Sequence, residues 1–122
     1  MIPSQMLKGT LEGCILQVIQ LEEAYGYRIS EQLKELGFGD VSEGTIYPIL
    51  LRLEKNGCVA TTYRTSTQGP RRKYYTLTEK GKEEVEKFYK SWTELSRAVT
   101  NLFEEKKEIE YGENNTYVTK AK

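Results

Sequence analysis

The chain has 122 residues, of which 38% are hydrophobic and 30% charged, and its 18 basic residues balance 18 acidic ones. This length suits one domain with a modest core and one outlying element. No apolar run approaches the roughly 18 residues that a membrane helix needs, and the N-terminus lacks a signal-peptide pattern, so we expect a cytoplasmic protein.

The sequence offers little material for metal binding or catalysis. Histidine is absent, and the two cysteines, Cys14 and Cys58, lie far apart. Structural zinc sites use closely spaced cysteine and histidine pairs, so we expect no metal and no cofactor. Paired carboxylates, a phosphate-binding glycine loop and a nucleophile motif are also missing, which argues against an enzyme. We interpret both cysteines as small buried hydrophobes, with oxidant sensing as the open alternative.

The balanced charge argues at first sight against nucleic-acid binding, because phosphate contacts need lysine and arginine. Its distribution changes this view. Positions 55–78 contain no acidic residue and five basic ones, Lys55, Arg64, Arg71, Arg72 and Lys73. A local basic field of this kind suits DNA binding although the total charge is zero.

Two amphipathic helices are predicted in the first third of the chain. The first has apolar residues at steps of three and four, weakened by Gly9 and Gly13, namely Leu7, Leu11, Cys14, Ile15, Val18 and Ile19. After the break at Tyr25-Gly26-Tyr27, the second helix places Ile29, Leu33 and Leu36 on one face. It ends in the glycine-rich segment 37–40.

A third helix is predicted to begin at the N-cap Ser42 and to end at Asn56-Gly57. Its buried stripe consists of Ile46, Ile49, Leu50 and Leu53. The opposite face consists of Gly44, Pro48, Leu51 and Lys55, flanked by Tyr47 and Arg52. Pro48 removes one helical hydrogen bond, so we expect a loosened first turn and not a broken helix.

Two strand-like runs follow at 59–64 and 73–77, rich in β-branched residues and tyrosine. The polar segment 65–72 between them ends in basic residues, which predicts a β-hairpin with a basic tip. Three helices followed by a hairpin is the order of a winged helix. We therefore predict a winged helix-turn-helix DNA-binding domain over 1–78.

The last helix, predicted over 79–110 with Thr78 as N-cap, has the most regular pattern. Its heptad seam consists of Val85, Phe88, Trp92, Leu95, Val99 and Leu102. The small head cannot cover this whole seam, so a second copy of the chain is the expected partner. Residues 111–122 are polar and are interpreted as a flexible tail. The predicted fold is mainly α with a small β-hairpin, followed by a coiled-coil-like dimerisation helix.

The third helix and the hairpin carry the DNA-binding hypothesis. A recognition helix presents its N-terminal residues to base edges in the major groove, here Ser42, Gly44, Thr45, Tyr47 and Pro48. Arg71, Arg72 and Lys73 would lie over phosphates or enter the minor groove. The alternatives are that Tyr47 only covers the edge of the core and that the basic loop is only solvated.

Trp92 is the candidate for a ligand site, with Phe88 and Leu95 beside it on the seam. On a two-fold axis its two copies would approach each other, and indole faces can sandwich a flat apolar molecule. The alternative is a large side chain that fills the dimer core.

The sequence resembles the PadR-like transcription regulators. The matching motifs span roughly 7 to 103 and are Leu7-Lys8-Gly9-Thr10-Leu11-Glu12, Tyr25-Gly26-Tyr27, the segment 42–54 and the segment 69–81. The resemblance implies a homodimeric repressor of inverted-repeat operators, with Tyr47 and its neighbours in the major groove and the wing from Gly69 to Lys73 on the backbone. Lys8 and Arg52, which lie in the matching motifs, join the DNA-binding candidates.

The single C-terminal helix resembles the compact branch of the family. Some of its members have a tryptophan in a similar context to Ser91-Trp92 and respond to flat hydrophobic drugs. This implies a small planar effector that releases the protein from DNA. The rival interpretation is a winged-helix protein-interaction module without sequence-specific DNA binding. The operator, the effector, the regulated genes and the choice between repressor and activator stay open.

Overall fold

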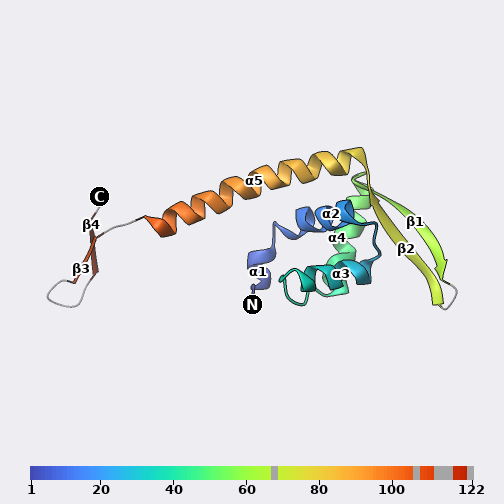
Figure 1. The fold of residues 1–122 in the computed structure, drawn as a ribbon, viewed down its shortest axis with the longest axis horizontal. Helices are drawn as coiled ribbons and strands as arrows, with labels where there is room; N and C mark the ends of the chain where they lie inside the picture. The colour runs from blue at the N-terminus through green and yellow to red at the C-terminus, as the bar shows by residue number, and fades with distance from the viewer. Residues whose placement is uncertain (67–68, 106–107, 112–116, 121–122) are drawn as a thin grey trace. The chain divides into compact units, whose positions relative to one another are not determined.

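A computed structural model describes residues 1–66, 69–105, 108–111 and 117–120. It forms two compact units, Met1–Lys90 and Ser91–Lys122. Figure 1 shows the order of elements, α1 (Ser4–Leu7), α2 (Leu11–Leu21), α3 (Gly26–Glu35), α4 (Glu43–Lys55), β1 (Val59–Ser66), β2 (Gly69–Leu77), α5 (Glu79–Glu104), β3 (Glu108–Tyr111) and β4 (Tyr117–Lys120). The predicted fold class, mainly α with a hairpin after three core helices, is confirmed.

The core lies in the first unit and joins α2, α3 and α4. Its most deeply buried large side chains are Ile15, Ile29, Leu33, Ile46, Leu50 and Leu53. These residues belong to the stripes that the periodicity predicts, because helices bury the face on which apolar residues recur every three or four positions. Leu36 was predicted in the same stripe, but it is 65% exposed. It lies beyond the last residue of α3, where the helical spacing no longer applies.

The predicted first helix is divided into α1 and α2. Gly9 interrupts it with a φ of 88°, a left-handed conformation that glycine adopts without steric cost. The predicted ends of α4 are confirmed, since the Ser42 hydroxyl accepts a hydrogen bond from the Thr45 N–H (3.3 Å) and Asn56 is the C-cap. Pro48 lies inside this continuous helix, as predicted.

The hairpin is longer than predicted. β1 and β2 pair antiparallel from Val59–Leu77 out to Ser66–Gly69, with Arg64 opposite Arg72. The prediction that the basic residues occupy the hairpin tip is therefore wrong, because they lie within strand β2. Polar residues in a two-stranded ribbon are compatible with strand as well as with turn, and here Arg64 and Arg71 lie over the rings of Tyr74 and Tyr63.

The C-terminal helix also ends earlier than predicted. Its N-cap Thr78 is confirmed by a hydrogen bond from the Gly81 N–H to the threonine hydroxyl (3.1 Å). However, α5 ends at Glu104 and not at 110, and β3 pairs with β4 where we expected a flexible tail. Isoleucine, valine and tyrosine are frequent in these two segments and favour extended backbone over helix. Among the described residues, the helices are too short or too polar to cross a membrane.

Candidate nucleic-acid interface

The exposed face of α4 contains the residues that were predicted to contact DNA bases. We call this face the reading surface. Ser42, Gly44, Thr45, Pro48 and Arg52 are all exposed, while Ile46 and Leu50 on the opposite side are buried. The arrangement follows from the helical repeat, because residues three or four positions apart share a face. The N-terminal half of α4 therefore offers small and polar side chains to a partner.

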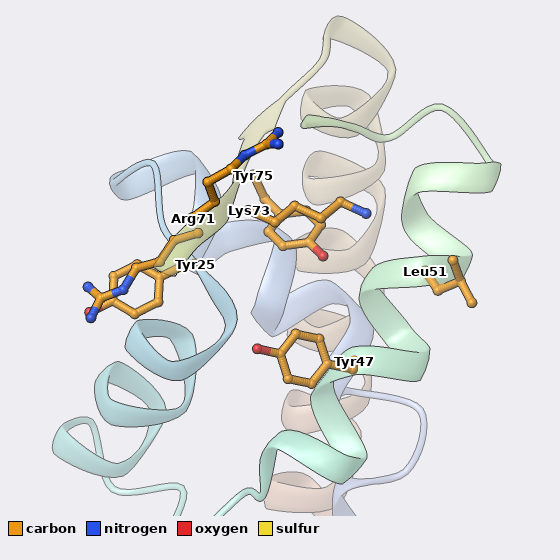
Figure 2. Close-up of a pocket in the computed structure, with 7 residues that line it drawn as sticks. Tyr25, Tyr47, Leu51, Arg71, Lys73 and Tyr75 are labelled. Atoms are coloured by element: carbon orange, nitrogen blue, oxygen red, sulfur yellow. The ribbon is translucent and has the colours of Figure 1, made fainter. Parts of the chain in front are cut away.

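A cleft of about 410 Å³ lies between this helix and the wing, by which we mean the hairpin of β1 and β2. It is lined by Tyr25, Tyr47, Leu51, Arg71, Arg72, Lys73 and Tyr75. Figure 2 shows that α4 contributes Tyr47 and Leu51, whereas β2 contributes Arg71, Lys73 and Tyr75. The structure thus brings together two groups of predicted site residues that are more than twenty positions apart in the sequence.

Tyr47 is held on α4 by two neighbours. Its ring lies against Gly26 of α3, and its hydroxyl donates to Glu43 Oε1 at 3.4 Å. Partial burial, with a smaller contribution from the Glu43 charge, raises the pKa of the Tyr47 phenol. The side chain is still 47% exposed. It therefore both covers the edge of the core and remains available for a contact outside the protein.

The described part of the wing has four cations, Arg64, Arg71, Arg72 and Lys73. Two of them are paired with acidic residues of the same chain. Arg64 forms an ion pair with Glu23 and lies over the Tyr74 ring. Lys73 Nζ lies 2.9 Å from Glu54 Oε1, and this hydrogen bond lowers the pKa of Glu54 and raises that of Lys73. The charges of these two cations are thus largely compensated.

The other two wing cations are stacked on tyrosine rings. The Arg71 guanidinium lies 4.7 Å from the Tyr63 ring centroid, and that of Arg72 lies 4.5 Å from the Tyr25 ring centroid. Neither forms an ion pair within the described residues. A stacked guanidinium keeps its N–H groups at the ring edge, where they can bind an anion. Arg71 and Arg72 are therefore the uncompensated charges of the wing.

The remaining DNA-binding candidates lie outside this cleft. Lys8 and Thr45 line a second cleft of about 320 Å³ beside the start of α4. Arg52 forms an exposed ion pair with Glu12 of α2, with 3.2 Å between the charged atoms. Gly69 begins β2 and pairs with Ser66. Lys8 is thus near the reading surface, whereas Arg52 already has an anionic neighbour.

Sequence reasoning missed three residues that shape this surface. Tyr25 and Tyr63 support the two free guanidinium groups, and Glu54 holds Lys73. Tyr63 could have been found from the strand alternation together with the hairpin register, since it lies opposite Lys73. No local signal identifies Glu54, because its partner is 19 positions away.

The predicted seam of α5 is divided by the structure. Val85 packs against the core, and the ring of Phe88 lies directly over Gly13 of α2. The later positions are exposed, with Trp92 at 44% and Leu102 at 70%. Leu95, Val99 and the unpredicted Phe103 are also exposed. The ligand candidates therefore differ, because Phe88 packs against Gly13 while Trp92 and Leu95 are exposed among the described residues.

The cysteines are free thiols, Cys58 buried and Cys14 half-buried. Burial raises the pKa of both, which reduces their reactive thiolate form at neutral pH. Within the described part of the chain, no group of three cysteine, aspartate or glutamate side chains is placed to hold a metal ion.

Known proteins are similar to this chain in sequence and in fold. The sequence profile of the transcriptional regulator PadR-like family matches residues 15–87. The chain belongs to the PadR-like family of transcriptional regulators. It is similar to a PadR-like transcriptional regulator from Bacillus cereus strain ATCC 14579, with 51% identity, a TM-score of 0.76, and coverage of 84% of this chain and 99% of that chain.

Two further similarities concern PadR of Bacillus subtilis. The negative transcriptional regulator PadR from strain 168 is 39% identical over 79 residues, which cover 62% of this chain and 42% of that protein. The crystal structure of Bacillus subtilis PadR in complex with operator DNA is similar with a TM-score of 0.61 and 31% identity. This match covers 66% of the PadR-like chain described here and 47% of the Bacillus subtilis chain.

Proposed function

We propose that this PadR-like regulator binds inverted-repeat operator DNA as a homodimer and represses transcription. The N-terminal half of α4 lies in the major groove, and Arg71 and Arg72 contact the phosphate backbone. The observation that carries this proposal is the pair of uncompensated guanidinium groups beside the exposed face of α4. The similar Bacillus subtilis PadR structure, which contains operator DNA, supports it.

The chemistry of α4 suits close approach to DNA. The first N–H groups of a helix have no partner within the helix, and its N-terminus carries partial positive charge. Gly44 places no side chain in front of these groups, and the Ser42 and Thr45 hydroxyls can donate to or accept from base edges. Tyr47 projects beside them, where its phenol reaches a base or a phosphate.

The dimer in this proposal is formed by the exposed part of α5. Trp92, Leu95, Val99 and Leu102 continue one heptad seam, and apolar positions at this spacing pack well against a second helix. In a two-fold dimer the two recognition helices would enter successive major grooves about 34 Å apart. An inverted repeat with this spacing is the operator that such a dimer requires.

A salt titration tests DNA binding. Binding of the protein to fluorescent DNA from upstream of its own gene is measured by anisotropy at several salt concentrations. We expect the logarithm of the affinity to fall linearly with the logarithm of salt, with a slope reduced by about 0.9 for each phosphate contact that is removed. Arg71→Gln and Arg72→Gln should each reduce the slope by about 0.9 for every subunit bound, because each variant removes one phosphate contact per subunit.

Arg97→Gln is the matched control, because Arg97 is an exposed arginine on α5, outside the first unit. It should keep the wild-type slope. Absence of binding at low salt would overturn the proposal. Normal promoter binding by the Arg71→Gln/Arg72→Gln double variant would favour the rival, a protein-interaction module with an incidental basic wing.

A small planar hydrophobic effector is the second part of the proposal, and of the predicted ligand residues Trp92 and Leu95 form its binding site. The exposed indole on the apolar seam of α5 supports it. Release from DNA requires that the effector bind the DNA-incompetent dimer more tightly than the competent one. Trp92 is the only tryptophan, so its fluorescence reports this site alone. Quenching by planar aromatic compounds is expected, and an unchanged signal across a broad panel would leave Trp92 as dimer packing.

A further inference from the structure

One ion pair joins α4, which carries the reading surface, to the wing. Glu54 near the end of α4 accepts hydrogen bonds from Lys73 Nζ of β2 (2.9 Å) and from the Thr61 hydroxyl of β1 (3.1 Å). The side chains of Glu54 and Lys73 are only 33% and 30% exposed. One carboxylate of α4 therefore holds both strands of the hairpin.

The position of this pair along β2 gives it mechanical importance. Tyr75, two residues closer to the base, is buried and exchanges backbone hydrogen bonds with Ala24 (2.9 and 3.4 Å). Arg71 and Arg72 lie on the other side of Lys73, toward the tip, and are stacked only on tyrosines. The ion pair is thus the last polar anchor on β2 before the two free cations, while Arg64 of β1, opposite Arg72, ties the other strand to Glu23.

A two-stranded ribbon has little stability of its own, so its direction depends on what holds it to the rest of the domain. The Lys73 ammonium also lies 5.5 Å from the centroid of the Tyr75 ring, which keeps it turned toward the domain. Because its charge is shared with Glu54 in a partly desolvated place, moving it to a phosphate would leave Glu54 without its cation.

We propose that Glu54 is a positioning residue that holds the wing against α4, and that Lys73 orients the wing instead of contacting a DNA phosphate. This inference rests on the proposed DNA binding and changes the role of one predicted contact. In this proposal Arg71 and Arg72 bind the DNA phosphate backbone. The Glu54–Lys73 pair orients the wing and so determines which phosphates the two arginines reach.

The salt dependence of operator binding distinguishes a cation that contacts a phosphate from a cation that only orients the wing. Lys73→Gln should weaken operator binding by about tenfold, since charge-assisted hydrogen bonds are among the stronger ones, with an unchanged salt slope. Arg71→Gln is the matched variant, and its slope should fall by about 0.9 per subunit. A slope for Lys73→Gln that falls as far as that of Arg71→Gln would overturn the inference, because Lys73 would then be a phosphate contact.

A double-mutant cycle tests whether Lys73 acts through Glu54. Glu54→Gln should also weaken operator binding, and Glu54→Gln/Lys73→Gln should cost little more than either single variant, because the partners of one interaction are not additive. Additive losses would overturn the inference.

A measurement without DNA keeps the test independent of the proposed function. Amide hydrogen exchange in the hairpin should be faster in Lys73→Gln than in the wild type and unchanged in Arg71→Gln. Unchanged exchange in Lys73→Gln would overturn the positioning role. Wild-type protein that shows no salt-dependent DNA binding would overturn the proposed function instead, while hydrogen exchange would still report whether the pair holds the wing.

Discussion

Gly26 of α3 and Tyr47 of α4 fit together because glycine has no side chain. A Cβ atom at Gly26 would lie 2.7 Å from both Cζ and Oη of Tyr47, closer than such atoms approach. The absence of a side chain lets the phenol ring lie against the start of α3 while it remains half-exposed. Gly26 therefore helps to position Tyr47 in the reading surface, in addition to starting α3 after the break between the two helices.

Gly26→Ala should alter DNA binding more than stability. The added methyl group meets the outer end of the tyrosine, which can rotate away, and alanine favours helix over glycine. We expect the free energy of unfolding in urea to change by less than about 1 kcal/mol, while operator affinity falls several-fold. Gly44→Ala is a control for unfolding, because a Cβ there meets only Ser42 Oγ at 3.7 Å. Operator affinity equal to that of the wild type would contradict this role of Gly26.

Gly13 and Phe88 offer a test of how α2 packs against the first part of α5 within the first unit. A Cβ at Gly13 would lie 2.1 Å from Phe88 Cγ, at the root of the ring, where rotation of the side chain gives little relief. Gly13→Ala should therefore cost about 1 to 3 kcal/mol of unfolding free energy, measured in urea, as overpacked cores do. In a Phe88→Ala background the same change should be neutral or stabilising, because only the helix preference of alanine remains. An equal cost in both backgrounds would show that the contact is not the cause.

Local signals in the sequence predicted both ends of α4 and most of the buried faces of the helices well. The capping role of Ser42 and the burial of Ile46 and Leu53 depend on residues within one or two helical turns, so a pattern in the chain is enough to find them. The position of Arg72 was different. It depends on where β1 and β2 stop pairing, and polar residues in a two-stranded ribbon are compatible with either strand or turn.

The heptad of α5 shows a second limit of sequence reasoning. Val85 and Phe88 belong to the same spacing as Val99 and Leu102, yet the first two pack against their own chain and the last two are exposed. Periodicity identifies an apolar face but not which molecule covers it. The Glu54–Lys73 pair was hidden for a related reason, since a contact between α4 and β2 exists only once the chain has folded.

The exposed half of the seam should control the oligomeric state. Val99→Glu places a charge in an apolar seam and should dissociate the proposed dimer into monomers in sedimentation velocity, because an unpaired charge buried in the interface is costly. Asn101→Glu adds the same charge at an exposed position of α5 outside the heptad seam and should remain dimeric. The unfolding transition of the first unit should be retained in both variants. A dimer that persists in Val99→Glu would move the interface away from this face.

Glu54 should make the protein sensitive to acid. The hydrogen bond from Lys73 holds the pKa of Glu54 below its ordinary value, with a further contribution from Thr61 and against partial desolvation, which raises it. A carboxylate with a lowered folded pKa stabilises the fold above its unfolded pKa of about 4.3, and this stabilisation is lost as pH falls through the folded pKa. The free energy of unfolding should therefore decrease less between roughly pH 6 and pH 3 in Glu54→Gln than in the wild type. Glu86→Gln, which removes an exposed carboxylate of α5 with no ion pair in the described residues, should follow the wild-type curve. Parallel curves for wild type and Glu54→Gln would show that the pair with Lys73 does not stabilise the fold.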